Sequence, residues 1–182
     1  RTEDGAEGGL GIAAGMDFLF PARFIWQAYR AVLPDGEVPE QSPFDKRRLV
    51  WRLYRLLPEL VKQDDAFTPL ARFLEGTDPA LRDFQLAEKV ADLFDQYQVF
   101  RADWLSVWEQ GRDAIITARG EEKALDPETR WQSLLWRKLV ENVGAPAHTS
   151  RSWIHTRFMA EGQRIHAPAN PSRLPRRIVV FG

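Results

Sequence analysis

The sequence predicts a mainly α-helical protein, and three observations support this fold class. Apolar residues recur every three or four positions over several long segments of the 182-residue chain, which is the period of an amphipathic helix. The clearest strand-like run, RIVVFG, is confined to the C-terminal end. A helix-capping residue also stands directly before a proline at four positions, a pattern typical of helix starts. These pairs are Ser42-Pro43, Thr68-Pro69, Asp78-Pro79 and Asp126-Pro127.

The first half of the chain predicts three long helical segments after a polar, glycine-rich start. PARFIWQAYRAVL, residues 21–33, places Pro21 in a first helical turn. SPFDKRRLVWRLYRLLPELVKQ, residues 42–63, offers Ser42 as its N-cap, and Pro58 should break or kink that helix. A third helix should run from Asp78 to about Phe100.

The second half predicts shorter helices separated by loops. RADWLSVWEQG should be a short helix closed by Gly111, and residues 112–126 are weakly patterned, which indicates a loop. PETRWQSLLWRKLVENVG is amphipathic and should end at Gly144 as a C-cap residue. Ser150 should cap a last helix over residues 151–163.

These elements divide the chain into three parts: a loop over residues 1–20, a helical domain over 21–163, and a proline-containing connector with one strand over 164–182. The strand RIVVFG has the composition of a buried strand in an α/β core. One strand cannot form a sheet, so we expect the chain to be a fragment of a longer protein, with this strand unpaired. Helical spacing predicts a core of Leu49, Leu53, Leu86, Val90, Phe94, Trp136 and Leu139.

The composition is that of a soluble globular protein, with 44% hydrophobic and 28% charged residues. The net charge of −1 excludes a general basic field for nucleic acid, so any such contact must be local. The absence of cysteine excludes disulfides and thiolate metal sites. No apolar run approaches the roughly 20 residues that span a bilayer, so we expect no membrane partner.

No motif in the chain predicts catalysis. GLGIAA, residues 9–14, resembles a dinucleotide fingerprint but follows no predicted strand, which that fingerprint requires. No phosphate-binding loop for ATP occurs. His148, His155 and His166 lack the spacing of metal ligands, and His155 is better explained as a packing residue. We therefore expect no catalytic site and no cofactor in this segment.

Two charged patterns are candidates for contact with a partner. Arg48, Arg52 and Arg55 share one helix face that suits phosphates or a partner's acids, but a solvated face, with Glu40 and Asp45 nearby, is the favoured interpretation. Glu88, Asp92 and Asp95 fall within about 60° of one another on a helix. Periodicity alone favours a solvated face for this row, and no further oxygen ligands suggest a divalent ion.

Several longer stretches resemble the gamma subunit of bacterial exodeoxyribonuclease V, the RecC family. The similar stretches are LGIAAGMDFLFPARFIW, FQLAEKVADLFDQYQVFRADWLSVWEQG, WQSLLWRKLVENVG, RSWIHTRF and LPRRIVVFG, in that order. The resemblance extends over residues 11–182. It implies a helical insertion domain of a degenerate superfamily 1 helicase-like fold that has lost its ATP motifs.

The resemblance also implies a function and partners. RecC proteins work with RecB and RecD, which supply the motors and the nuclease together with their ATP and Mg²⁺. RecC helps to split the duplex, guides the 3′ single strand through a tunnel and scans it for the recombination hotspot Chi, in the bacterial cytoplasm. The residues of this chain that match the hotspot-reading positions of the family are Phe20, Trp26, Asp92, Leu93, Asp95, Arg101 and Arg151.

That role would give these side chains distinct tasks. A carboxylate beside a phosphate costs energy, whereas a carboxylate can accept two hydrogen bonds from the edge of an unpaired guanine. Phe20 and Trp26 would stack on bases or wedge between them, and Arg101 and Arg151 would hold phosphate or a base edge. Two alternatives stay open: an active helicase whose ATP motifs lie outside this segment, and a helical protein-interaction module without DNA contact.

Overall fold

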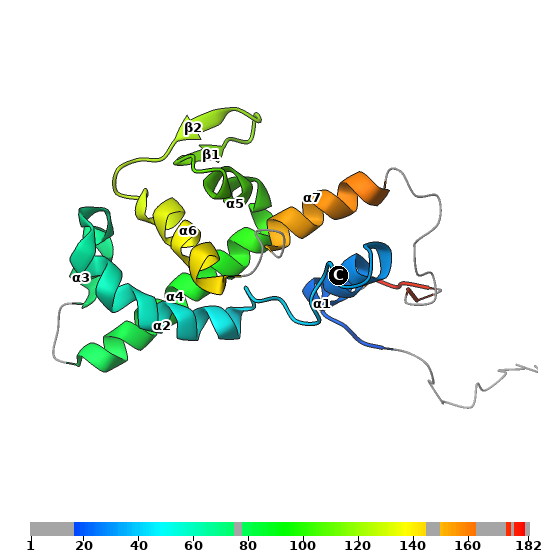
Figure 1. Cartoon of the computed structure of the whole chain (residues 1–182), viewed down its shortest axis with the longest axis horizontal. Helices are drawn as coiled ribbons and strands as arrows, with labels where there is room; N and C mark the ends of the chain where they lie inside the picture. The colour runs from blue at the N-terminus through cyan, green and yellow to red at the C-terminus, as the bar shows by residue number, and fades with distance from the viewer. Residues whose placement is uncertain (1–16, 75–77, 145–149, 163–173, 176, 181–182) are drawn as a thin grey trace, which may run out of the picture.

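A computed structural model describes residues 17–74, 78–144, 150–162, 174–175 and 177–180 of the chain (Figure 1). The described part is mainly helical, as the sequence predicts, with one small sheet. Its elements, in chain order, are α1 Pro21–Val32, α2 Lys46–Gln63, a 3₁₀ turn Asp65–Phe67, α3 Thr68–Leu74, α4 Pro79–Phe100, α5 Ala102–Glu109, β1 Ala114–Ile116, β2 Glu122–Ala124, α6 Trp131–Val143 and α7 Arg151–Gly162.

Helices α2 and α4 form the long antiparallel pair on which the rest of the domain is built (Figure 1). Lys46 at the start of α2 contacts Asp92 near the end of α4, and Tyr54 further along α2 contacts Phe84 near the start of α4. Helices α3, α5 and α6 pack around this pair. The pairing buries one side of α4 and leaves another flank of the helix exposed.

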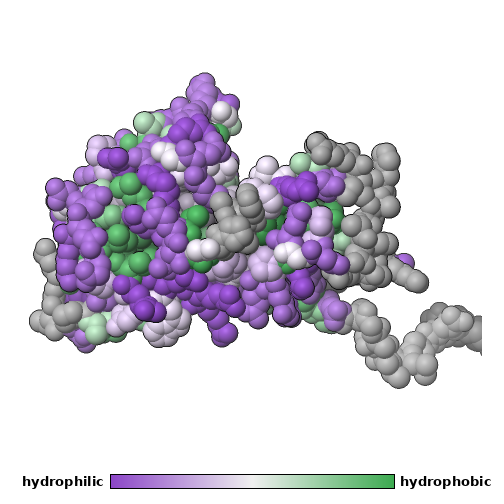
Figure 2. Space-filling model, viewed as in Figure 1, coloured by the Kyte–Doolittle hydropathy of each residue, from purple (hydrophilic) through white to green (hydrophobic). Residues whose placement is uncertain are grey.

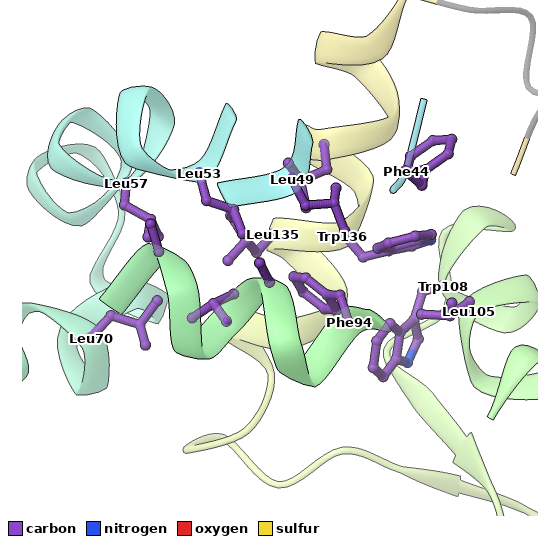
Figure 3. Close-up of a cluster of buried hydrophobic side chains, with 14 of the residues drawn as sticks. Phe44, Leu49, Leu53, Leu57, Leu70, Phe94, Leu105, Trp108, Leu135 and Trp136 are labelled. Atoms are coloured by element: carbon purple, nitrogen blue, oxygen red, sulfur yellow. The ribbon is translucent and has the colours of Figure 1, made fainter. Parts of the chain in front are cut away.

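The main hydrophobic core lies where α2, α4, α5 and α6 meet (Figure 3). Phe44, Phe94 and Trp136 stack at its centre, with ring centroids 5.2 and 5.3 Å from that of Trp136. Burying each such side chain stabilises the fold by about 1.5–3 kcal/mol. Every residue that helical spacing predicts for the core is buried, namely Leu49, Leu53, Leu86, Val90, Phe94, Trp136 and Leu139.

A second, smaller cluster joins α1 to α7. Tyr29, Leu33, Val38 and Ile154 are buried there, and Trp26, Trp153 and Phe158 pack against them. The ring of Tyr29 makes an edge contact with that of Phe158, with centroids 5.1 Å apart. Residues far apart in sequence therefore meet, because α7 returns across the molecule to the first helix (Figure 1).

Helix boundaries agree with the sequence where a local signal sets them. The side chain of Asp78 accepts a hydrogen bond from the backbone of Leu81 and caps α4. Ser150 accepts one from the backbone of Trp153 at the start of α7. Gly144 ends α6 with a φ of +60°, a left-handed conformation that favours glycine.

Two predicted starts are wrong, and a third is confirmed. Helix α2 begins at Lys46 with Asp45 as its N-cap, because Phe44 is drawn into the core and its carbonyl accepts a hydrogen bond from Gln98. Helix α3 does begin at Thr68, as Thr68-Pro69 predicts, although the Thr68 hydroxyl donates to the carbonyl of Asp65 in the preceding 3₁₀ turn. Residues 127–130 form turns rather than the first turn of α6.

Two further expectations need correction. Pro58 does not break α2, which runs on to Gln63. The predicted loop over residues 112–126 contains a β-hairpin in which β1 pairs antiparallel with β2, with Ile115 opposite Lys123. The indole N–H groups of Trp104 and Trp108 donate to carbonyls of β1 at 2.9 and 2.7 Å and fasten the hairpin to α5.

The predicted C-terminal strand does not form over its described residues, 177–180, which lie in no sheet. Ile178, Val179 and Val180 are exposed there, as expected for a strand without a parent sheet. The GLGIAA stretch, His148 and His166 lie outside the described residues.

Candidate nucleic-acid interface

The acidic row lies along one exposed flank of α4. Asp92 is exposed and Asp95 is half-buried, while Val90 and Phe94 on the same helix face the core. Glu88 continues the row one turn earlier and is exposed. Leu93 is about 200° from Asp95 around an ideal helix. The structure therefore brings the acids together and places Leu93, half-buried, on the other flank.

Asp92 is paired with Lys46 of α2. The Nζ of Lys46 lies 2.5 Å from a carboxylate oxygen of Asp92, and both side chains are about half exposed. This hydrogen bond is the main cause that raises the pKa of Lys46. A group that binds Asp92 must therefore share the carboxylate with Lys46 or displace its ammonium.

Asp95 faces the start of α7. Burial raises the pKa of Asp95, and the positive charge of Arg151 opposes that rise. Asp45 and Asp92 add to the rise because they are negative neighbours, while Lys46 opposes it. The site therefore contains two carboxylates on α4, with a cation from α2 and another from α7.

Arg151 also connects the acidic row to α1. The phenol of Tyr29 is a hydrogen-bond partner of Arg151, whose charge opposes the rise that burial causes in the pKa of Tyr29. The hydroxyl of Tyr29 lies 2.9 Å from Nδ1 of His155, one turn further along α7. His155 is exposed, and its ring also packs edge-on against that of Tyr29, with centroids 6.1 Å apart, in agreement with the packing role that the sequence suggested.

Trp26 lies beside this link. Its ring meets that of Tyr29 edge-on, with centroids 6.0 Å apart, and its indole N–H donates to the carbonyl of Pro39. Trp26 is therefore held in place on α1 by Tyr29 and the following loop. Its partly exposed ring has one fixed orientation, which suits a surface against which a base or another planar group stacks.

Besides Leu93, two further predicted site residues are not part of this cluster. Phe20 is 86% exposed in front of the first turn of α1. The guanidinium of Arg101 lies 4.1 Å from the ring centre of Trp104 and donates to the carbonyl of Ile116. It is therefore directed toward the hairpin. The structure groups Trp26, Asp92, Asp95 and Arg151, and does not group Phe20, Leu93 and Arg101 with them.

A partly buried glutamate fixes where α7 begins. The carboxylate of Glu109, at the end of α5, accepts hydrogen bonds from Trp136, Ser150 and Ser152 at 3.0, 3.1 and 3.2 Å. Burial raises the pKa of Glu109, and these three donors oppose the rise. Because Ser150 and Ser152 flank Arg151, Glu109 positions Arg151 without contacting it.

Sequence reasoning missed Lys46, Tyr29 and Glu109. Lys46 and Asp92 are 46 positions apart, and Tyr29 and His155 are 126 apart, so no local pattern connects either pair. The sequence offered one indication of the role of Glu109, namely the two serines, Ser150 and Ser152, on either side of Arg151, because both donate hydrogen bonds to its carboxylate.

Two of the three arginines that share a face of α2, Arg48, Arg52 and Arg55, already have partners within the protein. Arg48 donates to Gln41, and Arg52 donates to both the side chain and the carbonyl of Asn142. These bonds agree with a structural role for two of its three arginines.

The described residues offer neither a metal site nor a membrane-spanning helix. No group of three or more histidine, cysteine or acidic side chains there could hold a metal ion. No described helix is both long and apolar enough to cross a bilayer.

The fold and this site define a mainly helical domain that presents acidic, basic and aromatic side chains around one flank of a long helix. A family model described as the N-terminal domain of RecC matches residues 5–182. The chain therefore belongs to the RecC family, as its resemblance predicted.

Curated relatives agree with this assignment. The chain is 40% identical over 176 residues to the RecBCD enzyme subunit RecC of Escherichia coli, which covers 95% of the chain and 14% of that protein. It is 36% identical over 186 residues to the same subunit of Haemophilus influenzae, covering 94% of the chain and 16% of that protein. The chain thus spans about a seventh of the length of these relatives.

Proposed function

We propose that the chain is the N-terminal part of a non-catalytic RecC subunit in a RecBCD-type helicase–nuclease. In this role it assembles with RecB and RecD, which bind the ATP and Mg²⁺, in the bacterial cytoplasm. It forms part of the channel for the 3′ single strand during double-strand break repair. Membership of the RecC family and the names of its relatives support this role. The helical domain would be an insertion in a degenerate superfamily 1 helicase-like fold.

We further propose that the acidic flank of α4 reads unpaired bases, including those of the Chi hotspot. The observation that carries this proposal is the grouping of Asp92, Asp95 and Arg151 beside Trp26. Carboxylates repel the phosphate backbone but accept hydrogen bonds from base N–H groups, so bases must face α4. Arg151 would then contact a phosphate or a base edge, and Trp26 would supply a stacking surface.

Lys46 gives the site a way to exchange partners. In the free protein it neutralises Asp92, which removes the cost of an unpaired acid beside Asp95. When a guanine edge approaches, its N–H donors replace the ammonium of Lys46, which is then free to contact a nearby phosphate. The site would thus keep nearly the same number of favourable contacts in both states.

The test uses the full-length subunit assembled with its partners. Asp92→Asn and Asp95→Asn each replace an acceptor-only group with an amide, so each should weaken hotspot-dependent cutting by about 5- to 150-fold, equivalent to 1–3 kcal/mol per base contact. Unwinding rates should stay within about twofold, because the motors are untouched. Asp65→Asn, an exposed acid at the far end of α2, is the matched control. Unchanged hotspot cutting in both site variants would leave the acidic row as a solvated face.

A protein-interaction module is the second candidate, and one observation favours it. Large apolar side chains, including Trp51, Leu81 and Phe100, are exposed, and such residues are common in protein interfaces. Figure 2 also shows a hydrophobic area between α3 and α6, one of several on this face. Loss of RecB or RecD from the purified complex when these residues are changed to alanine, with DNA binding by the free subunit intact, would support this candidate.

A further inference from the structure

An exposed tryptophan on α2 lies outside the acidic site. Trp51 is 61% exposed. A tryptophan this exposed leaves a large apolar ring in water, where it adds little stability to the fold. Neither the core nor the acidic site uses it, so its exposed face is open to a planar ligand.

Two neighbouring aromatic rings hold Trp51 rigidly. Its ring meets Tyr54 edge-on at 6.1 Å and Phe84 of α4 at 5.9 Å, and Tyr54 and Phe84 meet each other at 6.3 Å. Each ring of this aromatic triad, Trp51, Tyr54 and Phe84, contacts the other two. A ring fixed in this way loses little conformational freedom when a ligand stacks on it.

Two arginines flank Trp51 on the same helix face. Arg47 and Arg55 are one turn before and one turn after it, and both are exposed. No described carboxylate lies within ion-pair distance of either guanidinium; the nearby Glu59 pairs with Lys62. Two cations about 12 Å apart, with a stacking ring between them, match a strand that alternates phosphates with planar bases.

The triad continues the acidic flank of α4. Phe84, Glu88, Asp92 and Asp95 fall within about 80° of one another around the helix, and Phe84 precedes Asp92 by about 12 Å of helix length. Glu88 and the acids repel phosphates on the α4 side. A strand on this face would therefore keep its backbone over the arginines of α2 and direct its bases toward α4.

We infer that Trp51, supported by Tyr54 and Phe84 and flanked by Arg47 and Arg55, is a second single-stranded DNA contact, at which one base stacks while the arginines bind the adjacent phosphates. This inference rests on the proposed function in that a single strand must reach this face. It adds a contact that is independent of base identity, because every base has a π-face. The acidic row would discriminate bases, and the Trp51 site would hold the strand in register.

The test again uses the full-length subunit assembled with RecB and RecD, bound to a duplex with a 3′ single-stranded tail. Trp51→Ala should weaken binding of the tail by about 5- to 150-fold, the range for loss of one stacked base. Trp51→Phe should recover most of this loss, since it keeps a ring. Phe73→Ala, which removes a partly exposed ring on α3, should change nothing. A tail carrying 5-bromouracil should cross-link to residue 51 in the native protein.

The arginines give a second measurement that does not depend on the tryptophan. Changing both Arg47 and Arg55 to glutamine should reduce the slope of log affinity against log salt concentration by about 1.4, at 0.7 per phosphate of a single strand. Both side chains are exposed, so the fold should be unaffected. An unchanged slope, together with unchanged affinity in Trp51→Ala, would overturn the inference.

The outcomes separate this inference from the proposed function. If Trp51→Ala dissociates the subunits while tail binding by the free subunit persists, Trp51 contacts protein and the inference is wrong. If the Asp92 and Asp95 variants keep their hotspot response but Trp51→Ala weakens binding, the base-reading role fails and the Trp51 site stands. If the reverse holds, the acidic row reads bases and the Trp51 site does not exist.

Discussion

Replacing Asp113 with asparagine should destabilise the fold at neutral pH and much less at acid pH. Asp113 follows α5 and accepts hydrogen bonds from Arg130, Ser133 and Arg137 at 2.7, 2.7 and 2.8 Å. It thereby ties the start of the hairpin to α6. An amide in its place keeps the shape but loses the charge, so the two arginines lose their counter-ion.

The magnitude follows from the pKa of Asp113. Burial alone would raise this pKa, but the hydrogen bonds from Ser133, Arg130 and Arg137 outweigh it and lower the value from 3.8 to about 2. That difference corresponds to about 2.4 kcal/mol at 1.36 kcal/mol per pH unit. Because the Asp113 side chain retains 24% exposure, solvent screening reduces the expected loss to about 1–2 kcal/mol.

The pH dependence has a definite sign. The folded-state pKa lies below the unfolded one, so the stabilisation is present above pH 4 and is lost as the pH falls toward 2. Linkage leaves about half of it at pH 3 and about a sixth at pH 2. Urea unfolding of the native chain and of Asp113→Asn, followed by tryptophan fluorescence at pH 7, 4 and 3, measures the difference. Asp126→Asn, an exposed acid nearby, is the control. Equal losses at all three pH values would refute the electrostatic explanation.

Three further predictions concern the fold. Leu53→Ala should lower the free energy of unfolding by about 2–5 kcal/mol because Leu53 is fully buried. Leu56→Ala, at a partly buried position, should cost clearly less. Equal losses of stability for the two variants in urea unfolding would contradict the packing. Gly144→Ala should lower the free energy of unfolding by about 1 kcal/mol because the φ of Gly144 is +60°. The loss should appear as a lower melting temperature, and a higher melting temperature would exclude the left-handed conformation of residue 144. Asp78→Ala should cost about 0.5–2 kcal/mol by removing the cap of α4, and faster hydrogen exchange confined to the first turn of α4 would confirm the site of the loss.

The core was predictable because it depends on local periodicity. Leu49 and Leu53 recur on one face of α2, and Val90 and Phe94 recur on one face of α4, so the spacing alone identifies the buried side. The start of α2 was not predictable in the same way. The core draws in Phe44, a tertiary effect that overrides the local signal at Ser42.

The hairpin was missed because its strands are only three residues long, shorter than any alternation that a sequence reveals. Tryptophans of α5, rather than strand propensity, hold it in place.

The candidate site was predictable only in part. Helical spacing alone placed Asp92 and Asp95 on one flank, and the resemblance to the RecC family added Trp26 and Arg151. Their grouping depends on α7 packing against α1 and α5, which no local pattern encodes. Helix geometry could have separated Leu93 from Asp95, because two positions along a helix differ by about 200°. The direction of Arg101 depends on the hairpin that the sequence did not reveal.

The hydrogen bonds of Glu109 determine how firmly α7, and with it Arg151, is held in place. Helix α7 is tethered at its first residues by the partly buried carboxylate of Glu109, and each hydrogen bond withdrawn from that carboxylate would cost about 1–3 kcal/mol. The C-terminal half of α7 is held separately, because Phe158 packs against Tyr29 and Arg157 pairs with Glu37. Two attachments therefore fix the helix, one at each end. If α7 contributes to a base-reading site as proposed, a change at Glu109 would displace Arg151 without altering any side chain that is proposed to meet DNA.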